Sequence, residues 1–117
     1  IGTIAPVTGS VAEEVLRNGV SACSEDPRFD PVRPDELSDL VYSVDVLSPA
    51  EPVETEAALD VRRYGVIVSS GNKRGLLLPN LDGVGTVAEQ ISIARQKAGI
   101  RAGEPVKLER FEVVRHQ

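Results

Sequence analysis

An acidic and a basic side chain share a short proline-containing loop. Asp26 and Arg28 lie two residues apart in the sequence Asp-Pro-Arg-Phe. Opposite charges at this spacing can together bind a carboxylate-bearing ligand, or they can fasten the loop by pairing with each other. The sequence leaves both interpretations open and makes both residues candidates for a binding site.

A third candidate, Asp45, lies inside an apolar stretch. Residues 40–48 alternate in the manner of a β-strand, and Asp45 falls among valines and leucines. Because an unpaired buried carboxylate is costly, Asp45 must be paired or its pKa must be raised. It is therefore a structural anchor or a functional acid. We favour the anchor, since structural ion pairs also perturb carboxylates.

The single cysteine and the single histidine limit the chemistry that this chain can supply. One Cys and one His cannot build a zinc site of the usual four ligands, so we expect no metal and no cofactor. His116 is the penultimate residue, which is a poor position for a catalytic base, and Ser-His-Asp or Cys-His mechanisms are not expected. A lone Cys23 forms no internal disulfide and is compatible with a reducing cytoplasm. No apolar run reaches the roughly 18 residues of a membrane span.

A glycine motif precedes the second predicted helix. Residues 83–88 match the dinucleotide-binding pattern G-x-G-x-x-[GA]. That pattern requires a strand directly before the first glycine, whereas residues 79–82 intervene here, and Asp82 would repel a pyrophosphate. We therefore interpret this segment as a plain helix-entry loop.

Seven basic side chains raise the possibility of a nucleic-acid surface. Such a surface for single strands would need aromatic side chains between the cations, and the chain has only two Tyr and two Phe. Nucleic-acid binding is therefore not expected on these grounds, and we expect most of the seven to be solvated. Arg74 is the expected exception, because it follows a predicted tight turn. The set is Arg62, Arg63, Lys73, Arg74, Arg95, Lys97 and Arg101.

Charge is distributed unevenly along the chain. Residues 1–60 hold 13 acids and 3 bases, whereas residues 61–117 hold 5 acids and 10 bases. Such polarity can mark a site for an anionic partner on the second half. We favour the alternative that the two halves neutralise each other in space, because sequence halves seldom form separate faces of one small domain.

Hydrophobic periodicity predicts an α+β fold. Ser10 and Thr86 each open a capping box, so each is expected to begin an amphipathic helix, the second of which ends at Gly99. The first helix has an apolar stripe that should pack on a sheet, with Cys23 as a small core residue, and Phe29 should fix the loop that follows. The predicted strands are residues 1–7, 40–48, 64–69, 75–79 and 106–115, with a hairpin turn at 70–74 and a short helix at 54–60. This order predicts a mixed or mostly antiparallel sheet with two amphipathic helices packed on it.

Several segments together resemble the AMMECR domain family, also known as protein A of the prokaryotic AmmeMemoRadiSam system. The resemblance runs nearly end to end and rests on their combination. The segments are Ile-Gly-Thr-Ile at 1–4, Asp-Pro-Arg-Phe at 26–29, Ser-Val-Asp-Val-Leu-Ser-Pro at 43–49, Tyr-Gly-Val-Ile-Val at 64–68, Arg-Gly-Leu-Leu-Leu-Pro at 74–79, Glu-Gln-Ile-Ser-Ile-Ala-Arg-Gln-Lys-Ala-Gly at 89–99 and Leu-Glu-Arg-Phe-Glu-Val at 108–113.

The resemblance implies one AMMECR-like domain over residues 1–117, with a smaller subdomain region and a cleft. The chain begins with Ile1 and contains no Met, and the resemblance implies that about a third of the domain precedes Ile1. Ile1 and Gly2 would then end the family's Leu-Arg-Gly-Cys-Ile-Gly segment, whose Arg and Cys lie outside the chain. The candidate cleft residues are Ile1, Gly2, Asp26, Arg28, Asp45, Arg74 and Gln90.

Three functional hypotheses follow. The leading one is a cytoplasmic accessory module that binds a partner or a substrate, because members of the resembled family are encoded or fused with a Memo-like protein, related to extradiol dioxygenases, and with a radical-SAM protein. The first alternative is an enzyme whose cleft combines the absent Arg-Cys pair with Arg28, Asp45 or Arg74. The second is a nucleic-acid-binding module that uses the basic residues between 62 and 101. Oligomeric state and ligand are open.

Overall fold

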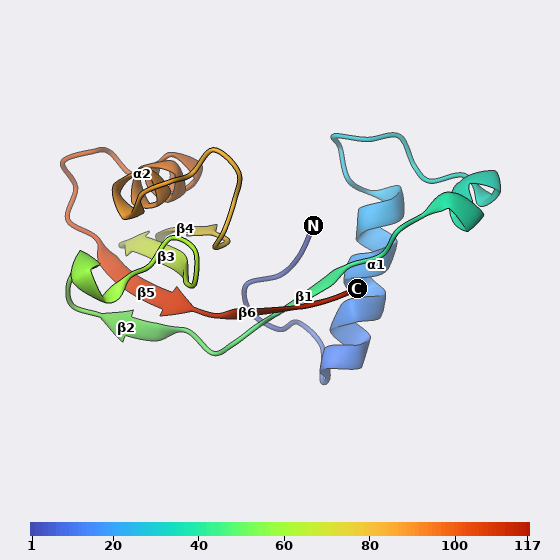
Figure 1. The fold of residues 1–117 in the computed structure, drawn as a ribbon, viewed down its shortest axis with the longest axis horizontal. Helices are drawn as coiled ribbons and strands as arrows, with labels where there is room; N and C mark the ends of the chain where they lie inside the picture. Colours follow the sequence, from blue (N-terminus) through green and yellow to red (C-terminus); the bar gives the residue numbers. More distant parts are fainter. The chain divides into compact units, whose positions relative to one another are not determined.

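The structure, a computed structural model, describes residues 1–117 and has an α+β fold (Figure 1). The chain forms two compact units, residues 1–44 with residue 117, and residues 45–116. All strand pairs of the larger sheet are antiparallel, which confirms the predicted fold class. No helix combines the length and the apolar character that crossing a membrane would require.

The second unit is built on a four-stranded sheet. Its strands are β2 (Glu51–Val53), β3 (Gly65–Ser70), β4 (Lys73–Leu77) and β5 (Lys107–Phe111), in the order β2-β5-β3-β4. The β3–β4 hairpin turns at Gly71, whose φ of 60° is the left-handed conformation that glycine adopts without strain. A second, two-stranded sheet pairs β1 (Val44–Leu47) with β6 (Val113–His116).

Helix α2 (Val87–Ala98) packs against β3 and β4 and closes the core. The Thr86 hydroxyl accepts the amide of Glu89 at 3.1 Å, and Gly99 ends the helix in the left-handed conformation, so both predicted ends are confirmed. Ile91 and Ala94 on the inner face of α2 are buried, as expected for an amphipathic helix. The core cluster consists of Leu59, Val66, Val68, Leu77, Ile91, Ala94 and Ile100.

The first unit contains α1 (Val11–Ser24) and a short 3₁₀ helix, η1 (Pro34–Asp39). Ser10 caps α1 by accepting the amide of Glu13 at 3.2 Å, which confirms the predicted start. The predicted burial of the α1 stripe is wrong, because no residue of this helix is buried and Cys23 is exposed. Periodicity shows which face of a helix is apolar, but it does not show what covers that face.

Residues 1–7 form no strand, contrary to the prediction. The carboxylate of Glu14 accepts hydrogen bonds from the amides of Val7 and Thr8 and from the hydroxyl of Thr3, so the end of this segment is bonded to α1 and not to a neighbouring strand. Those hydrogen bonds lower the pKa of Glu14, and the hydrogen bond from Thr3 has the largest effect.

Two other predicted strands are shorter than expected. The stretch 40–48 is a strand only at β1, and the stretch 106–115 is divided at Glu112 into β5 and β6. The amide of Glu112 donates to the Ser48 hydroxyl, and the Ser48 amide donates to the Glu112 carbonyl, both at 2.8 Å. The break in the strand therefore lies where Glu112 bonds with Ser48, next to Pro49. Residues 54–60 contain the 3₁₀ helix η2 (Glu56–Ala58).

Candidate functional site

Asp26 and Arg28 form a two-point ion pair. The Arg28 Nε and Nη2 atoms donate to the two carboxylate oxygens of Asp26 at 3.0 and 2.7 Å, and the Arg28 amide donates to the same carboxylate at 3.0 Å. The Asp26 side chain is nearly buried, whereas that of Arg28 is largely exposed. The guanidinium also lies 5.4 Å from the ring of Phe29. This geometry fastens the loop from within, and Phe29, which is 70% exposed, does not fix it as predicted.

The ion pair gives Asp26 an acidic pKa. The side-chain hydrogen bond from Arg28, followed by the backbone hydrogen bond from the same residue, lowers the Asp26 pKa from 3.8 to about 2. A carboxyl group whose pKa is lowered on folding stabilises the native state above its unfolded-state pKa. That contribution is lost as the pH falls from about 4 through about 2.

Replacing Arg28 should raise the Asp26 pKa. In Arg28→Gln the backbone amide still donates while the guanidinium is gone, so we expect the pKa to rise above about 2 and stay below 3.8. Carboxyl titration by NMR would measure the change. Arg17→Gln removes an equal charge from α1 and should leave the Asp26 pKa unchanged. An unshifted pKa in Arg28→Gln would contradict the assigned cause.

Asp45 is paired in the same way. The Arg115 Nε and Nη2 atoms each donate to one carboxylate oxygen of Asp45 at 2.8 Å, which joins β1 to β6. The side-chain hydrogen bond from Arg115 lowers the Asp45 pKa. A carboxylate that is fully paired and more acidic than usual has the geometry of a structural anchor and is a poor proton acceptor at neutral pH.

Arg74 is exposed, contrary to the expectation that it is less solvated than the other bases. Its Nη2 atom lies 3.7 Å from a carboxylate oxygen of Glu109, across the sheet from β4 to β5. An exposed pair at this distance contributes little to stability. Arg74 is therefore a surface residue of the sheet whose charge is partly balanced.

Gln90 is a completely buried polar residue of α2. Its exposed fraction is 0%, and its Nε2 atom donates to the carbonyl of Tyr64 at 2.9 Å, immediately before β3. The Oε1 atom has no hydrogen-bond partner in the chain. The Nε2 group therefore links the helix to the sheet, while the Oε1 atom is left unpaired in the core.

The seven candidate residues are distributed over the two units. Ile1, Gly2, Asp26 and Arg28 belong to the first unit, whereas Asp45, Arg74 and Gln90 belong to the second. Asp26 and Arg28 are brought together, and each of the three in the second unit has a different partner. Ile1 and Gly2 are exposed.

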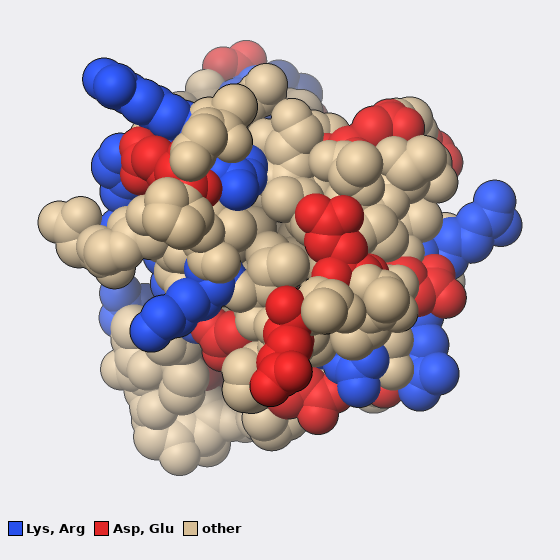
Figure 2. Space-filling model, turned by 90° about the vertical axis from the view of Figure 1, so that its left-hand side faces the viewer, with Lys and Arg blue, Asp and Glu red and all other residues tan.

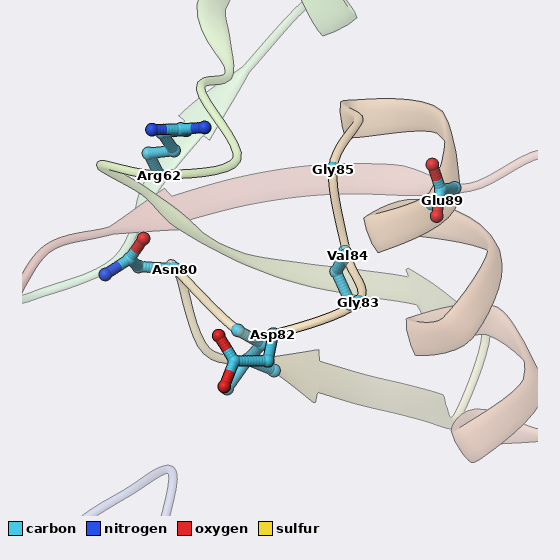
Figure 3. Close-up of a pocket in the computed structure, with 8 residues that line it drawn as sticks. Arg62, Asn80, Asp82, Gly83, Val84, Gly85 and Glu89 are labelled. Carbon is cyan, nitrogen blue, oxygen red and sulfur yellow. The ribbon is translucent and has the colours of Figure 1, made fainter.

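A surface hollow lies at the entry to α2, where the sequence indicated only a loop. It measures about 480 Å³ and its wall runs from the end of β4 to the first turn of α2 (Figure 3). Asn80 has a φ of 56° there and is the one residue other than glycine in the left-handed conformation. The acids Asp82 and Glu89 lie before and after the glycines. The lining residues are Arg62, Asn80, Leu81, Asp82, Gly83, Val84, Gly85 and Glu89.

Most of the basic residues between 62 and 101 have partners. Arg63 pairs with Glu112 at 3.3 Å and Lys73 with Glu104 at 3.2 Å, while Lys97 donates to the Leu76 carbonyl at 2.8 Å. On the face shown in Figure 2, acidic and basic side chains are intermixed and no continuous basic patch is visible. The pairs of Arg110 with Glu51 and of Arg115 with Asp45 join the basic half of the sequence to the acidic half.

Comparison with known proteins assigns the chain to a family. The model of the AMMECR1 family matches residues 1–116. The chain belongs to the AMMECR1 family. A protein of Thermotoga maritima is 50% identical over 118 aligned residues, which cover all of this chain and 68% of that protein. The resemblance seen in the sequence is thereby confirmed.

Two further relatives show how the match is distributed. A Clostridium acetobutylicum protein is 53% identical over the whole chain, and the match spans only 25% of that protein. The crystal structure of an uncharacterized Pyrococcus horikoshii protein is similar with a TM-score of 0.82 at 29% identity, covering 95% of this chain and 60% of that one. This chain therefore spans between a quarter and about two thirds of these AMMECR1-family relatives.

Proposed function

We propose that this AMMECR1-family chain is an accessory module that binds a partner protein or a substrate and does not catalyse a reaction alone. The observation that carries the proposal is the pairing of its candidate polar groups. Asp26 and Asp45 are each held by two guanidinium nitrogens, and both are more acidic than usual. Neither carboxylate is poised to exchange a proton near neutral pH.

Exposed aromatic side chains support the binding role. Phe29 and Tyr42, two of the four aromatic residues, are 70% and 65% exposed. Aromatic side chains are enriched at protein interfaces because they bury a large area at a small entropic cost. Both lie in the first unit, so we place the binding surface for a partner there.

The proposed partners are the Memo-like protein and the radical-SAM protein of the pathway with which the resembled family is associated. The match with the Clostridium protein spans a quarter of its length, which leaves room for further domains in that relative. A cytoplasmic location is part of the same proposal, since a lone cysteine needs no oxidising compartment.

Direct association tests the proposal. The intact protein, mixed with its Memo-like and radical-SAM partners, should give a complex in light scattering whose mass is that of the components together. Phe29→Ala should weaken the complex by about tenfold, the loss of one interface anchor. Val114→Ala, which truncates an exposed apolar residue of the second unit, is the matched control. Absence of any complex would contradict the proposal.

The enzyme alternative is decided by a separate measurement. An enzyme of this kind would need the cysteine of the family segment that the resemblance places ahead of Ile1. Substitution of that cysteine by alanine in the intact protein should leave formation of the pathway product unchanged if the module is accessory. Loss of product with retained complex formation would favour the enzyme.

A further inference from the structure

The hollow at the entry to α2 has a wall that hydrogen bonds of the backbone hold in place. The Asn80 amide donates to the Val61 carbonyl at 2.8 Å, which fixes the start of the loop. The Val84 amide donates to the Leu81 carbonyl at 3.2 Å, and Gly83, with a φ of 81°, is the third residue of the resulting turn. The wall is therefore formed by the chain itself, as is usual for sites that bind small molecules.

The charged side chains of this wall have few partners in the chain. Arg62 donates from its backbone amide to Asp60 at 2.9 Å, while its guanidinium forms no ion pair and no hydrogen bond. The Asp82 carboxylate also accepts no hydrogen bond. One oxygen of Glu89 accepts from the Thr86 hydroxyl at 3.1 Å, and its other oxygen is free. Both signs of charge are therefore available to a ligand.

Positive and negative charge lie on different sides of the hollow. Figure 3 shows Arg62 and Asn80 on one side and Glu89 on the opposite side. Asp82 lies on the segment that connects the two sides. A guanidinium and a side-chain amide can bind a carboxylate, and two carboxylates can bind cationic groups. One base and two acids give the wall a net charge of −1, so a ligand with one carboxylate and two cationic groups would balance it.

Two simpler classes of ligand fit this wall poorly. A divalent cation would meet two carboxylates and a repelling guanidinium, and no group of three His, Cys, Asp or Glu side chains suited to a metal ion occurs in the chain. A phosphate would meet one guanidinium and two carboxylates of its own sign. A molecule that carries both signs of charge avoids both conflicts.

We propose that this hollow binds a free basic amino acid. The carboxylate of the ligand pairs with Arg62 and accepts a hydrogen bond from Asn80. Its two cationic groups pair with Asp82 and Glu89, and the side chain of Leu81 contacts its methylene groups. The volume of about 480 Å³ is in the usual range of ligand pockets. The hollow belongs to the second unit alone, so this proposal goes beyond the partner binding proposed for the first unit.

NMR titration of the isotope-labelled intact protein with L-arginine tests the proposal. We expect the amides of residues 80–89 to shift. Agmatine, which lacks the carboxylate, should bind about tenfold more weakly because one two-point ion pair is lost. Nα-acetyl-L-arginine represents the last residue of a peptide, and it should bind about threefold more weakly because it lacks the α-ammonium group.

Three variants assign the contacts. Arg62→Gln should weaken the binding of L-arginine about tenfold and should not weaken that of agmatine. Asp82→Ser should weaken the binding of both compounds. Arg63→Gln is the matched control, because it removes an equal charge from the neighbouring residue, which is not part of the wall. Unchanged amide shifts of Val66 and Val68 would report that the core is folded in each variant.

Four results would overturn this assignment. The first is the absence of shifts at residues 80–89, and the second is unchanged affinity for L-arginine in Arg62→Gln. Tighter binding of inorganic phosphate than of L-arginine would identify an anion site instead. Equal binding of the acetylated compound would identify the end of a peptide as the ligand. None of these results bears on the association with the pathway partners, which is measured separately.

Discussion

Gly75→Ala is expected to destabilise the second unit by about 3 kcal/mol, the upper end of the cost of overpacking a core. A Cβ atom at residue 75 would overlap the backbone carbonyl oxygen of Ala94 and lie 3.0 Å from the Cβ atom of Ala98. The obstacle is the backbone of α2, which cannot rotate away as a side chain could. The helix must therefore move off β4 or the strand must bend.

Chemical denaturation followed by far-UV circular dichroism would measure this loss. Gly103→Ala is the matched control, because nothing lies within 4 Å of a Cβ atom there and Gly103 has no positive φ. It should change the free energy of unfolding by less than about 0.5 kcal/mol. Equal stabilities of the two variants would show that α2 does not approach β4 as closely as described.

Gly65→Ala is expected to lower the free energy of unfolding of the second unit by about 2 to 3 kcal/mol, for a different reason. The added Cβ atom would overlap the ring of Phe111, which lies across Gly65 in the neighbouring strand and is 2% exposed. Here the obstacle is a side chain, so the clash should depend on the identity of residue 111.

A double-mutant cycle isolates this dependence. Phe111→Leu alone should destabilise the unit because it leaves a cavity. Combined with Gly65→Ala, the loss should be smaller than the sum of the two single losses by at least 1 kcal/mol, since the smaller side chain makes room for the methyl group. Additive losses, measured by the same denaturation, would contradict the close packing of the Phe111 ring against Gly65.

Local signals along the chain predict α2 and the β3–β4 hairpin of the second unit, whereas no local signal predicts β2. The capping box at Thr86 and the glycine at position 99 delimit α2, and two short apolar runs with a Gly-Asn turn between them specify the β3–β4 hairpin. These predictions hold because each depends on contacts within a few residues. The break between β5 and β6 was missed because it depends on Ser48, which is 64 residues away from Glu112.

The candidate site was less predictable than the fold. The sequence suggested an Asp26–Arg28 pair because the two residues are neighbours, but nothing local indicated that Arg115 pairs with Asp45 across 70 residues. At the start of α2 the pattern of residues 83–88 predicts only a plain helix-entry loop, and nothing in it indicates the hollow. The left-handed conformation of Asn80 and the position of Arg62 in the wall of the hollow become visible only in three dimensions.

The sequence by itself determined the α+β class, the family, the two helix starts and the presence of a single Cys and a single His. These properties depend on residue type and short-range spacing. The tertiary structure decided which polar groups are neutralised and which apolar face is left uncovered, because pairing and burial depend on residues far apart in the chain. Asp45 is an example of a neutralised polar group, since its role as an anchor depends on Arg115. Leu16 is an example of an uncovered apolar residue, since the periodicity of α1 predicts its burial while its surroundings leave it 72% exposed.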